Sequence, residues 1–196
     1  FKKFISERQV SRLGVVGSSE ITAETIEKSF KRFLSLLEKH FSIFPFLLGK
    51  RPASADFAMF GQLSQLVGFD PTSRKIAHEI SPRTVAWVSL MEDLSGLEVS
   101  DQDWILDEVP ESLSNIFKEI GKVYAPALLA NKEATLKDEK TWKAFIDDSE
   151  WTQQTFPYQV KCLNWINEEF EKLDNKEKNK VNLFLKKNNC EKLLKN

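Results

Sequence analysis

Few residues of this 196-residue chain combine the side chain and the spacing that catalysis or metal binding requires. The two histidines, His40 and His78, fall on predicted helices among charged or polar neighbours, so we expect both on the surface rather than as a general base or a metal ligand. Asp147 and Asp148 favour a turn, because no further carboxylates follow at the spacing of a metal site. The sequence also lacks a Gly-rich phosphate loop, a paired-histidine motif and a serine nucleophile elbow.

The two cysteines, Cys162 and Cys190, lie far apart and match no metal-ligand spacing. A nucleophilic thiolate needs a cationic neighbour or a helix N-terminus to lower its pKa, and Cys162 follows Lys161 in the first turns of a helix that starts near Pro157. Adjacent helical residues point in different directions, however, and free cysteine is among the most buried residue types. We therefore expect Cys162 to be a buried structural thiol and both cysteines to be reduced, although two cysteines could in principle pair.

The composition is that of a compact globular protein. Hydrophobic residues make up 41% of the chain and aromatic residues 11%. The 28 basic and 29 acidic side chains give a net charge of -1. No excess of positive charge is left to neutralise phosphates, which argues against a nucleic-acid partner. No apolar run approaches the roughly 20 residues of a membrane span, and the N-terminus leads into a charged helix rather than a signal peptide. We expect a cytoplasmic protein without a membrane partner.

The elements that must position any site are read from hydrophobic periodicity. Three- and four-residue apolar steps predict an amphipathic helix over residues 22–44 with Thr22 as its N-cap. Pro126 should kink or end a further helix near Tyr124. Residues 141–154 break the helical period and alternate, which indicates a small β-hairpin. Residues 98–111 form an acidic connector, and the other predicted helices cover residues 1–13, 54–68, 74–79, 82–94, 113–128, 157–173 and 181–194, the last with a break at 188–189.

The segment over residues 46–63 is the most informative part of the chain. The apolar run Phe46-Leu47-Leu48 stops at Gly49, a turn with Pro52 follows, and a helix opens with Asp56 in its first turn. Asp56 can accept the backbone N–H of Ala53, which gives half of a reciprocal cap. The helix is apolar on nearly every side, so we expect it to be the buried centre of a helical domain, in which Gln62 and Gln65 would need hydrogen-bond partners.

This Leu-Leu-Gly, Pro, Ala-Asp-Phe pattern resembles the C-terminal, all-helical domain of the glutathione S-transferase family. Ala53 stands where many members have Ser or Thr, which is a departure from the pattern. Residues 124–131, 156–163 and 189–191 resemble segments of an uncharacterised bacterial branch with an extended C-terminus. The resemblance implies an all-α bundle with extra C-terminal helices. It also implies a transferase-like domain over residues 1–97 and a helical extension over residues 98–196 that together form one continuous unit.

The resemblance also implies a set of ligand-contacting residues. In this family the first helix of the helical domain gives an apolar wall to the electrophile, and here that helix carries Arg8, Gln9, Arg12 and Leu13. Arg8 and Arg12 lie one turn apart and could meet a carboxylate of glutathione or of an acidic substrate. Pairing with acids of another domain, or exposure to solvent, is an equal alternative for them. Tyr158 is a further candidate for which a core or interface role is the alternative.

The function implied by the resemblance is that of the electrophile-binding, substrate-side half of a glutathione transferase-like protein. Too little chain precedes residue 46 for a thioredoxin-like domain, so we expect this chain to be inactive alone, with no bound cofactor and with glutathione as an implied co-substrate. Its partners would be that missing domain or a second protomer, as in a dimer, and a small electrophilic or apolar molecule. Two alternatives stay open: a non-catalytic protein-interaction module, or a carrier of small apolar ligands.

Overall fold

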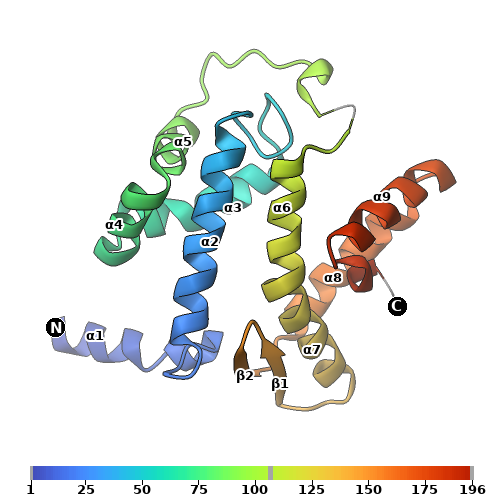
Figure 1. The fold of residues 1–196 in the computed structure, drawn as a ribbon. Helices are drawn as coiled ribbons and strands as arrows, with labels where there is room; N and C mark the ends of the chain where they lie inside the picture. The colour runs from blue at the N-terminus through green and yellow to red at the C-terminus, as the bar shows by residue number, and fades with distance from the viewer. Residues whose placement is uncertain (1, 106–107, 195–196) are drawn as a thin grey trace. The chain divides into compact units, whose positions relative to one another are not determined.

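The computed structural model describes residues 2–105 and 108–194, which are mostly helical and include one small antiparallel sheet (Figure 1). The chain forms two compact units, one made of residues 1–29 and 117–196 and the other of residues 30–116. The boundaries fall inside helices α2 (Ala23–Phe41) and α6 (Glu111–Glu119). The mostly helical class with one hairpin is confirmed, and the division at residue 97 stays a prediction. Asp107, in the acidic connector, lies outside the described residues.

The 30–116 unit places three helices, α3 (Ser54–Gly68), α4 (Pro71–Ile80) and α5 (Pro82–Glu92), after the end of α2. Asp70 and Ser81 cap α4 and α5 by accepting backbone N–H groups, and a proline follows each cap at the first helical position. A short 3-10 turn, η2 (Asp101–Asp103), lies in the connector. The apolar core of this unit includes Leu34, Leu37, Phe46, Leu63, Val67, Ala77, Trp87, Val88 and Met91.

The prediction that residues 54–68 form the buried centre of a domain is wrong. Helix α3 packs one face on α4 and α5 and buries Leu63 and Val67 there. Its other faces are open, and Phe57 is 54% exposed. Gln62 and Gln65 are exposed as well, so they need no partner inside the protein. The apolar composition of a helix does not by itself predict burial, which also requires neighbouring elements on every side.

The expected half-cap at the start of α3 is confirmed. The fully buried Asp56 carboxylate accepts the N–H of Ala53 at 2.9 Å and that of Leu47 at 2.9 Å. One acidic side chain thereby holds both the helix start and the turn that leads into it. Burial raises the pKa of Asp56, and the two N–H groups act in the opposite direction.

The other unit begins with α1 (Lys2–Val10) and the 3-10 turn η1 (Leu13–Val16), followed by the start of α2. After α6 come the π-helical turn η3 (Ile120–Tyr124) and α7 (Ala125–Leu136), so the helix is interrupted just before Pro126 as predicted. Strands β1 (Thr141–Ile146) and β2 (Ser149–Gln154) form the predicted hairpin. Helices α8 (Pro157–Glu171) and α9 (Asn175–Lys187) and the turn η4 (Glu191–Leu194) complete the unit.

Two local features fix the hairpin in its unit. Asp147 and Asp148 form its turn with φ of 44° and 66°, the left-handed backbone that two-residue hairpin turns require. The hydroxyls of Ser149 and Thr25 are hydrogen-bonded at 2.6 Å, which ties β2 to the first turns of α2. The predicted N-cap, Thr22, instead turns its hydroxyl back to the preceding loop, where it donates to the Gly17 carbonyl at 2.7 Å.

Candidate functional site

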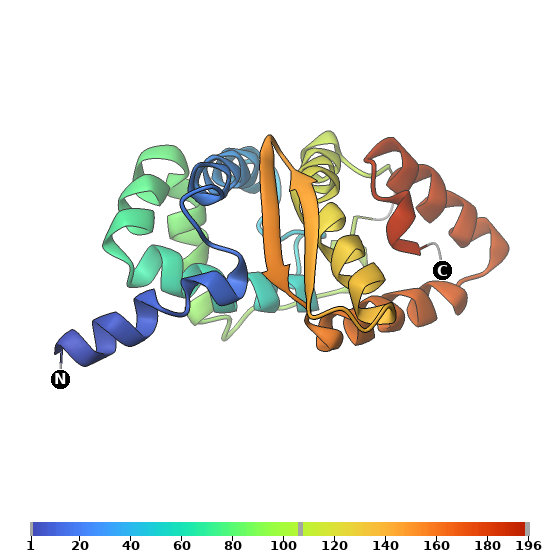
Figure 2. The same cartoon turned by 90° about the horizontal axis from the view of Figure 1, so that it is seen from below.

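The hairpin packs on α7 because the two elements present complementary side chains. Alternation along β1 puts Trp142 and Ile146 on the face toward α7. Figure 2 shows the hairpin, in orange, beside this helix. At three- and four-residue spacing α7 offers Ala127, Ala130 and Ala134, and these small side chains leave room for the indole ring. Trp142, Ile146 and Ala134 form the buried cluster of this layer.

The helix before α7 changes its hydrogen bonding at the edge of this layer. Over Ile120–Tyr124 the chain forms a π turn, and the Ala125 N–H donates to the Ile120 carbonyl five residues back. The next residue, Pro126, has no N–H to donate, which is one reason for a regular helix to stop here. Insertions of this kind widen a helix locally and are frequent at functional sites. This turn brings Val123 and Tyr124 to the wall of a cavity.

An apolar cavity of about 290 Å³ lies between α7, the hairpin and η1. Its wall comes from segments that are far apart in the sequence but belong to the same unit. We call it the α7–hairpin cavity, and its lining residues are Val16, Val123, Tyr124, Ala127, Leu128, Trp142, Ile146, Trp151, Gln153 and Gln159.

The polar groups of the α7–hairpin cavity are few, and two of them are paired with each other. The indole N–H of Trp151 donates to the side-chain oxygen of Gln153 at 3.1 Å. Burial raises the pKa of Tyr124, with the Cys162 thiol adding to the effect, so the phenol stays protonated at neutral pH. The Tyr124 hydroxyl and the Gln159 amide are therefore the groups that could orient a polar atom of a bound molecule.

Gly17 packs closely against Trp151, one of the residues that line the cavity. It has φ of +77°, and its N–H donates to the Gly14 carbonyl at 3.1 Å, which ends the η1 turn. A Cβ added at this position would lie 2.1 Å from the indole nitrogen of Trp151. Only glycine lets the backbone adopt this conformation and approach the indole so closely.

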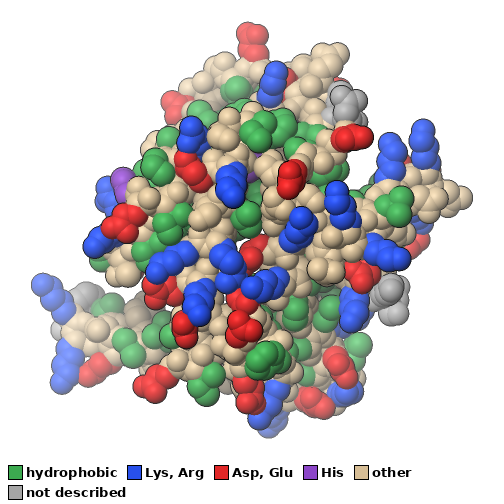
Figure 3. Space-filling view, in the orientation of Figure 1, with side chains coloured by type: hydrophobic (Ala, Val, Ile, Leu, Met, Phe, Trp, Pro, Cys, Tyr) green, Lys and Arg blue, Asp and Glu red, His purple; other side chains and the backbone are tan. Residues whose placement is uncertain are grey.

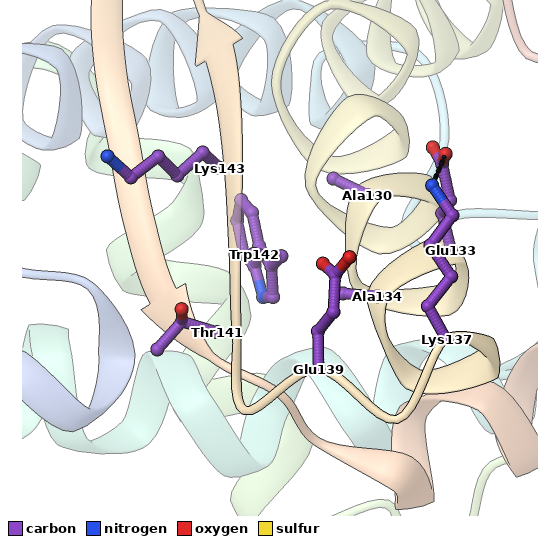
Figure 4. A pocket seen from close by; sticks show the side chains of 8 residues that line it. All are labelled: Ala130, Glu133, Ala134, Lys137, Glu139, Thr141, Trp142 and Lys143. Carbon is purple, nitrogen blue, oxygen red and sulfur yellow. Dashed lines mark hydrogen bonds and ion pairs between the residues drawn. The ribbon is translucent and has the colours of Figure 1, made fainter.

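Trp142 also lines a second hollow, of about 420 Å³ (Figure 4). Its charged groups include Glu133, in the last turn of α7, and Lys137, one residue past the end of this helix, which are paired at 2.6 Å. Glu139 reaches into it from the loop after α7. We call it the Glu139 hollow; Ala130, Ala134, Thr141, Trp142 and Lys143 complete its lining.

The residues implied by the transferase resemblance lie on exposed surface. Arg8 and Gln9 are on α1, a helix that buries no residue, while Arg12 follows it and is exposed too. Leu13 is 50% exposed, but Val16, in the same η1 turn, lines the α7–hairpin cavity. Tyr158 is 64% exposed, and its ring lies edge-on to Trp165 on α8. The role of these residues in binding stays a prediction.

The residues that do line the cavity were not predicted from the sequence. The alternation of Trp142, Ala144 and Ile146 predicts a hairpin but not its place in the fold. Set beside the alanines at 127, 130 and 134, it could also have predicted which helix the hairpin packs on. The contribution of Val16 has no sequence signal, because it depends on a contact between segments more than a hundred residues apart.

The prediction that His40 lies on the surface is wrong, because its side chain is fully buried. One ring nitrogen lies 3.2 Å from the Phe46 carbonyl, which fixes Nε2 as the donor, and Nδ1 then accepts from the Ser112 hydroxyl at 3.0 Å. Burial lowers the pKa of His40. His78 is exposed, as predicted.

The cysteines are free thiols, as predicted. Cys162 is half-buried on α8, and Cys190 is fully buried with its thiol donating to the Phe117 carbonyl at 3.3 Å. Burial raises the pKa of Cys190, which makes it a poor nucleophile.

Metal and membrane sites find no support in residues 2–105 and 108–194. No group of three or more His, Cys, Asp or Glu side chains within them could hold a metal ion. No helix of this part of the chain has the length and apolar character to cross a bilayer. The face drawn in Figure 3 carries acidic and basic side chains close to one another, with hydrophobic side chains among them.

Comparison with known proteins yields no relative. No family model matches the chain, and neither a curated protein nor a solved structure matches it. The transferase resemblance therefore stays a prediction, and the function must be argued from the geometry.

Proposed function

We propose that this chain binds a small, largely apolar molecule in the α7–hairpin cavity and does not by itself catalyse a reaction on it. The observation that carries the proposal is the cavity of about 290 Å³, walled by η1, the π turn, α7, the hairpin and α8. Concave apolar walls with a few polar groups are the usual form of a small-molecule site.

The size of the cavity limits the ligand. An apolar cavity of about 150 Å³ is enough to bind benzene, so about 290 Å³ suits a molecule of roughly two fused rings. The Tyr124 hydroxyl and the Gln159 amide could take a hydrogen bond from one polar substituent. A charged ligand is disfavoured, because none of the lining residues carries a charge at neutral pH.

The transferase-like function would use the same cavity. If the resemblance holds, the bound molecule would be the electrophile, and the thiol nucleophile would come from glutathione held by a thioredoxin-like domain or a second protomer. The position of Val16 supports the transferase-like function. Val16 lies in the same η1 turn as Leu13, so this N-terminal turn forms part of the cavity wall. Arg8, Gln9 and Arg12 would then be free to meet that partner.

A protein-interaction module is the second candidate. The open face of α3 favours it, because Phe57 on this helix is 54% exposed and Phe69, one residue past its end, is 80% exposed. Exposed apolar patches mark surfaces that bind another protein. A size measurement and a pull-down separate this candidate from the first, since only a stable protein complex supports it.

The direct test of ligand binding is a calorimetric titration with 1-naphthol, which has two fused rings and one hydroxyl. We expect saturable binding to the native chain and its loss in Ala127→Phe, which places a ring inside the cavity. Ala23→Phe makes the same substitution at an exposed position of the same unit and should bind like the native chain. No binding by the native chain, or equal binding by Ala127→Phe, would contradict the proposal.

A further inference from the structure

Helix α8 carries an open apolar face beside the α7–hairpin cavity. Tyr158, Trp165 and Ile166 are each more than half exposed, and Cys162 among them is half-buried. The steps of three and four residues from Tyr158 through Cys162 to Trp165 and Ile166 place these side chains on one face of the helix. The four side chains include no carboxylate, ammonium or guanidinium group. The face is therefore suited to an uncharged, apolar occupant.

The two aromatic rings of this face already form a pair. The Tyr158 and Trp165 ring centroids lie 6.0 Å apart with an angle of 87° between the ring planes, an edge-on arrangement that is favourable for aromatic side chains. This contact holds both rings while more than half of each residue stays open to solvent. A third ring can pack on the pair without first having to order it, which lowers the entropic cost of binding.

The α7–hairpin cavity meets this face at Tyr124. Tyr124 lines the cavity and is also more than half exposed, so it stands where the cavity opens to solvent. Its phenol lies near the Cys162 thiol, which contributes to the rise of the Tyr124 pKa. Gln159 lines the cavity too, next to Tyr158 and three residues before Cys162 on the same helix. The mouth of the cavity, Cys162 and the aromatic pair are therefore neighbours within one unit.

The spacing along α8 sets the length of a ligand that uses both places. Trp165 lies six residues after Gln159, which is about 9 Å along the axis of an α-helix. Tyr158 lies beside Gln159 at the start of the helix. A molecule of two fused rings inside the cavity does not extend this far. A second ring carried on a short flexible link would leave the cavity past Cys162 and meet the pair.

We propose that the Tyr158–Trp165 pair is an outer subsite of the α7–hairpin cavity, and that the ligand is an elongated, uncharged molecule with two separate aromatic parts. One part fills the cavity with its polar atom at Tyr124 and Gln159. The other part passes Cys162 and packs on the Tyr158–Trp165 pair. This subsite rests on the proposed function, because it holds the outer ring only when the cavity holds the inner one.

Two ethers that differ by one phenyl ring test the subsite. 1-Ethoxynaphthalene fills the cavity alone, whereas 1-(2-phenylethoxy)naphthalene carries a phenyl ring at the end of the same link. Equilibrium dialysis against the native chain measures the bound fraction of each ether. We expect the longer ether to bind about tenfold more tightly, which is the effect of one well-packed aromatic contact.

Substitutions of the pair show whether this preference comes from the subsite. Trp165→Ala and Tyr158→Ala should each remove most of the preference and leave the binding of 1-ethoxynaphthalene unchanged. Phe145→Ala is the matched control, because it removes an exposed ring of β1 that does not line the cavity, and it should keep the preference.

Three results would overturn the subsite. The first is binding of the shorter ether with no gain for the longer one, and the second is an equal loss of preference in Trp165→Ala and Phe145→Ala. The third is a dimer of the native chain that Trp165→Ala dissociates, because a second copy would then cover this face. All three leave the binding of 1-naphthol in the cavity untouched, whereas failure of 1-naphthol and of both ethers would contradict the proposed function as well.

Discussion

Replacing Asp56 should destabilise the 30–116 unit far more than replacing other helix-capping acids. In Asp56→Ala the N–H groups of Leu47 and Ala53, each 2.9 Å from the carboxylate, lose their acceptor inside the fold. An unsatisfied buried donor costs about 1–3 kcal/mol, so two donors would cost about 4 kcal/mol. The variant no longer buries a carboxylate, and this gain offsets part of the cost, because burial disfavours the charged form and raises the pKa of Asp56. We expect a net loss of about 3 kcal/mol.

This loss is measured by urea unfolding followed by far-UV circular dichroism, and it corresponds to a fall of about 10 °C in melting temperature. Asp56→Asn keeps one acceptor oxygen, so it should lose about half as much. Asp70→Ala is the matched control, because Asp70 caps α4 with one bond to the Ser73 N–H at 2.8 Å on exposed surface. If Asp56→Ala costs no more than Asp70→Ala, the reasoning from burial and pairing is refuted.

Three further predictions concern pH, backbone conformation and glutathione. Because burial lowers the pKa of His40, the unfolded chain takes up a proton below its ordinary pKa of about 6.5 while the folded chain does not. The free energy of unfolding should therefore fall as pH drops from 7 to 5.5, by up to about 1.4 kcal/mol per pH unit. In thermal melts, His40→Gln should flatten this part of the stability profile, and His78→Gln should leave it unchanged. In denaturant titrations, Gly17→Ala should destabilise the protein more than Gly96→Ala, because both glycines have φ near +77° but only Gly17 faces Trp151. Equal losses of stability would rule out the close contact. The chain alone should show no thermal shift with millimolar glutathione and no conjugation of a chlorinated aromatic, whereas a saturable shift would indicate its own glutathione site and make Arg8 and Arg12 the first residues to mutate.

Local signals in the sequence predicted most of the elements. The alternation around Trp142 and the acids at 147–148 gave the hairpin and its turn, because both depend on neighbouring residues. Pro126 correctly predicted the interruption before α7 for the same reason.

Burial was harder to predict, since it depends on elements that are distant in the sequence. His40 has charged neighbours in the sequence, yet packing around the Phe46 carbonyl and Ser112 buries it completely. Helix α3 shows the opposite case, because its sequence is almost uncharged and yet Phe57 and Leu66 are exposed. Sequence periodicity shows which face of a helix is apolar but not whether another element covers that face.

The candidate site could be predicted only in part. The cavity needs η1, α7, the hairpin and α8 together, and only the hairpin and the helices were foreseen as separate elements. None of the residues taken from the transferase resemblance lines the cavity. One of them, Leu13, lies in the η1 turn, and another residue of that turn, Val16, does line it.

Nuclear Overhauser contacts from bound 1-naphthol show whether an apolar molecule occupies the α7–hairpin cavity. We expect contacts from the naphthol protons to methyl groups of Val16, Val123, Leu128 and Ile146, which reach the cavity from η1, the π turn, α7 and β1. Leu183, which is 70% exposed on α9, serves as a surface reference and should give none. Contacts confined to Leu183 or to the open face of α3, or no contacts at saturation, would contradict the account.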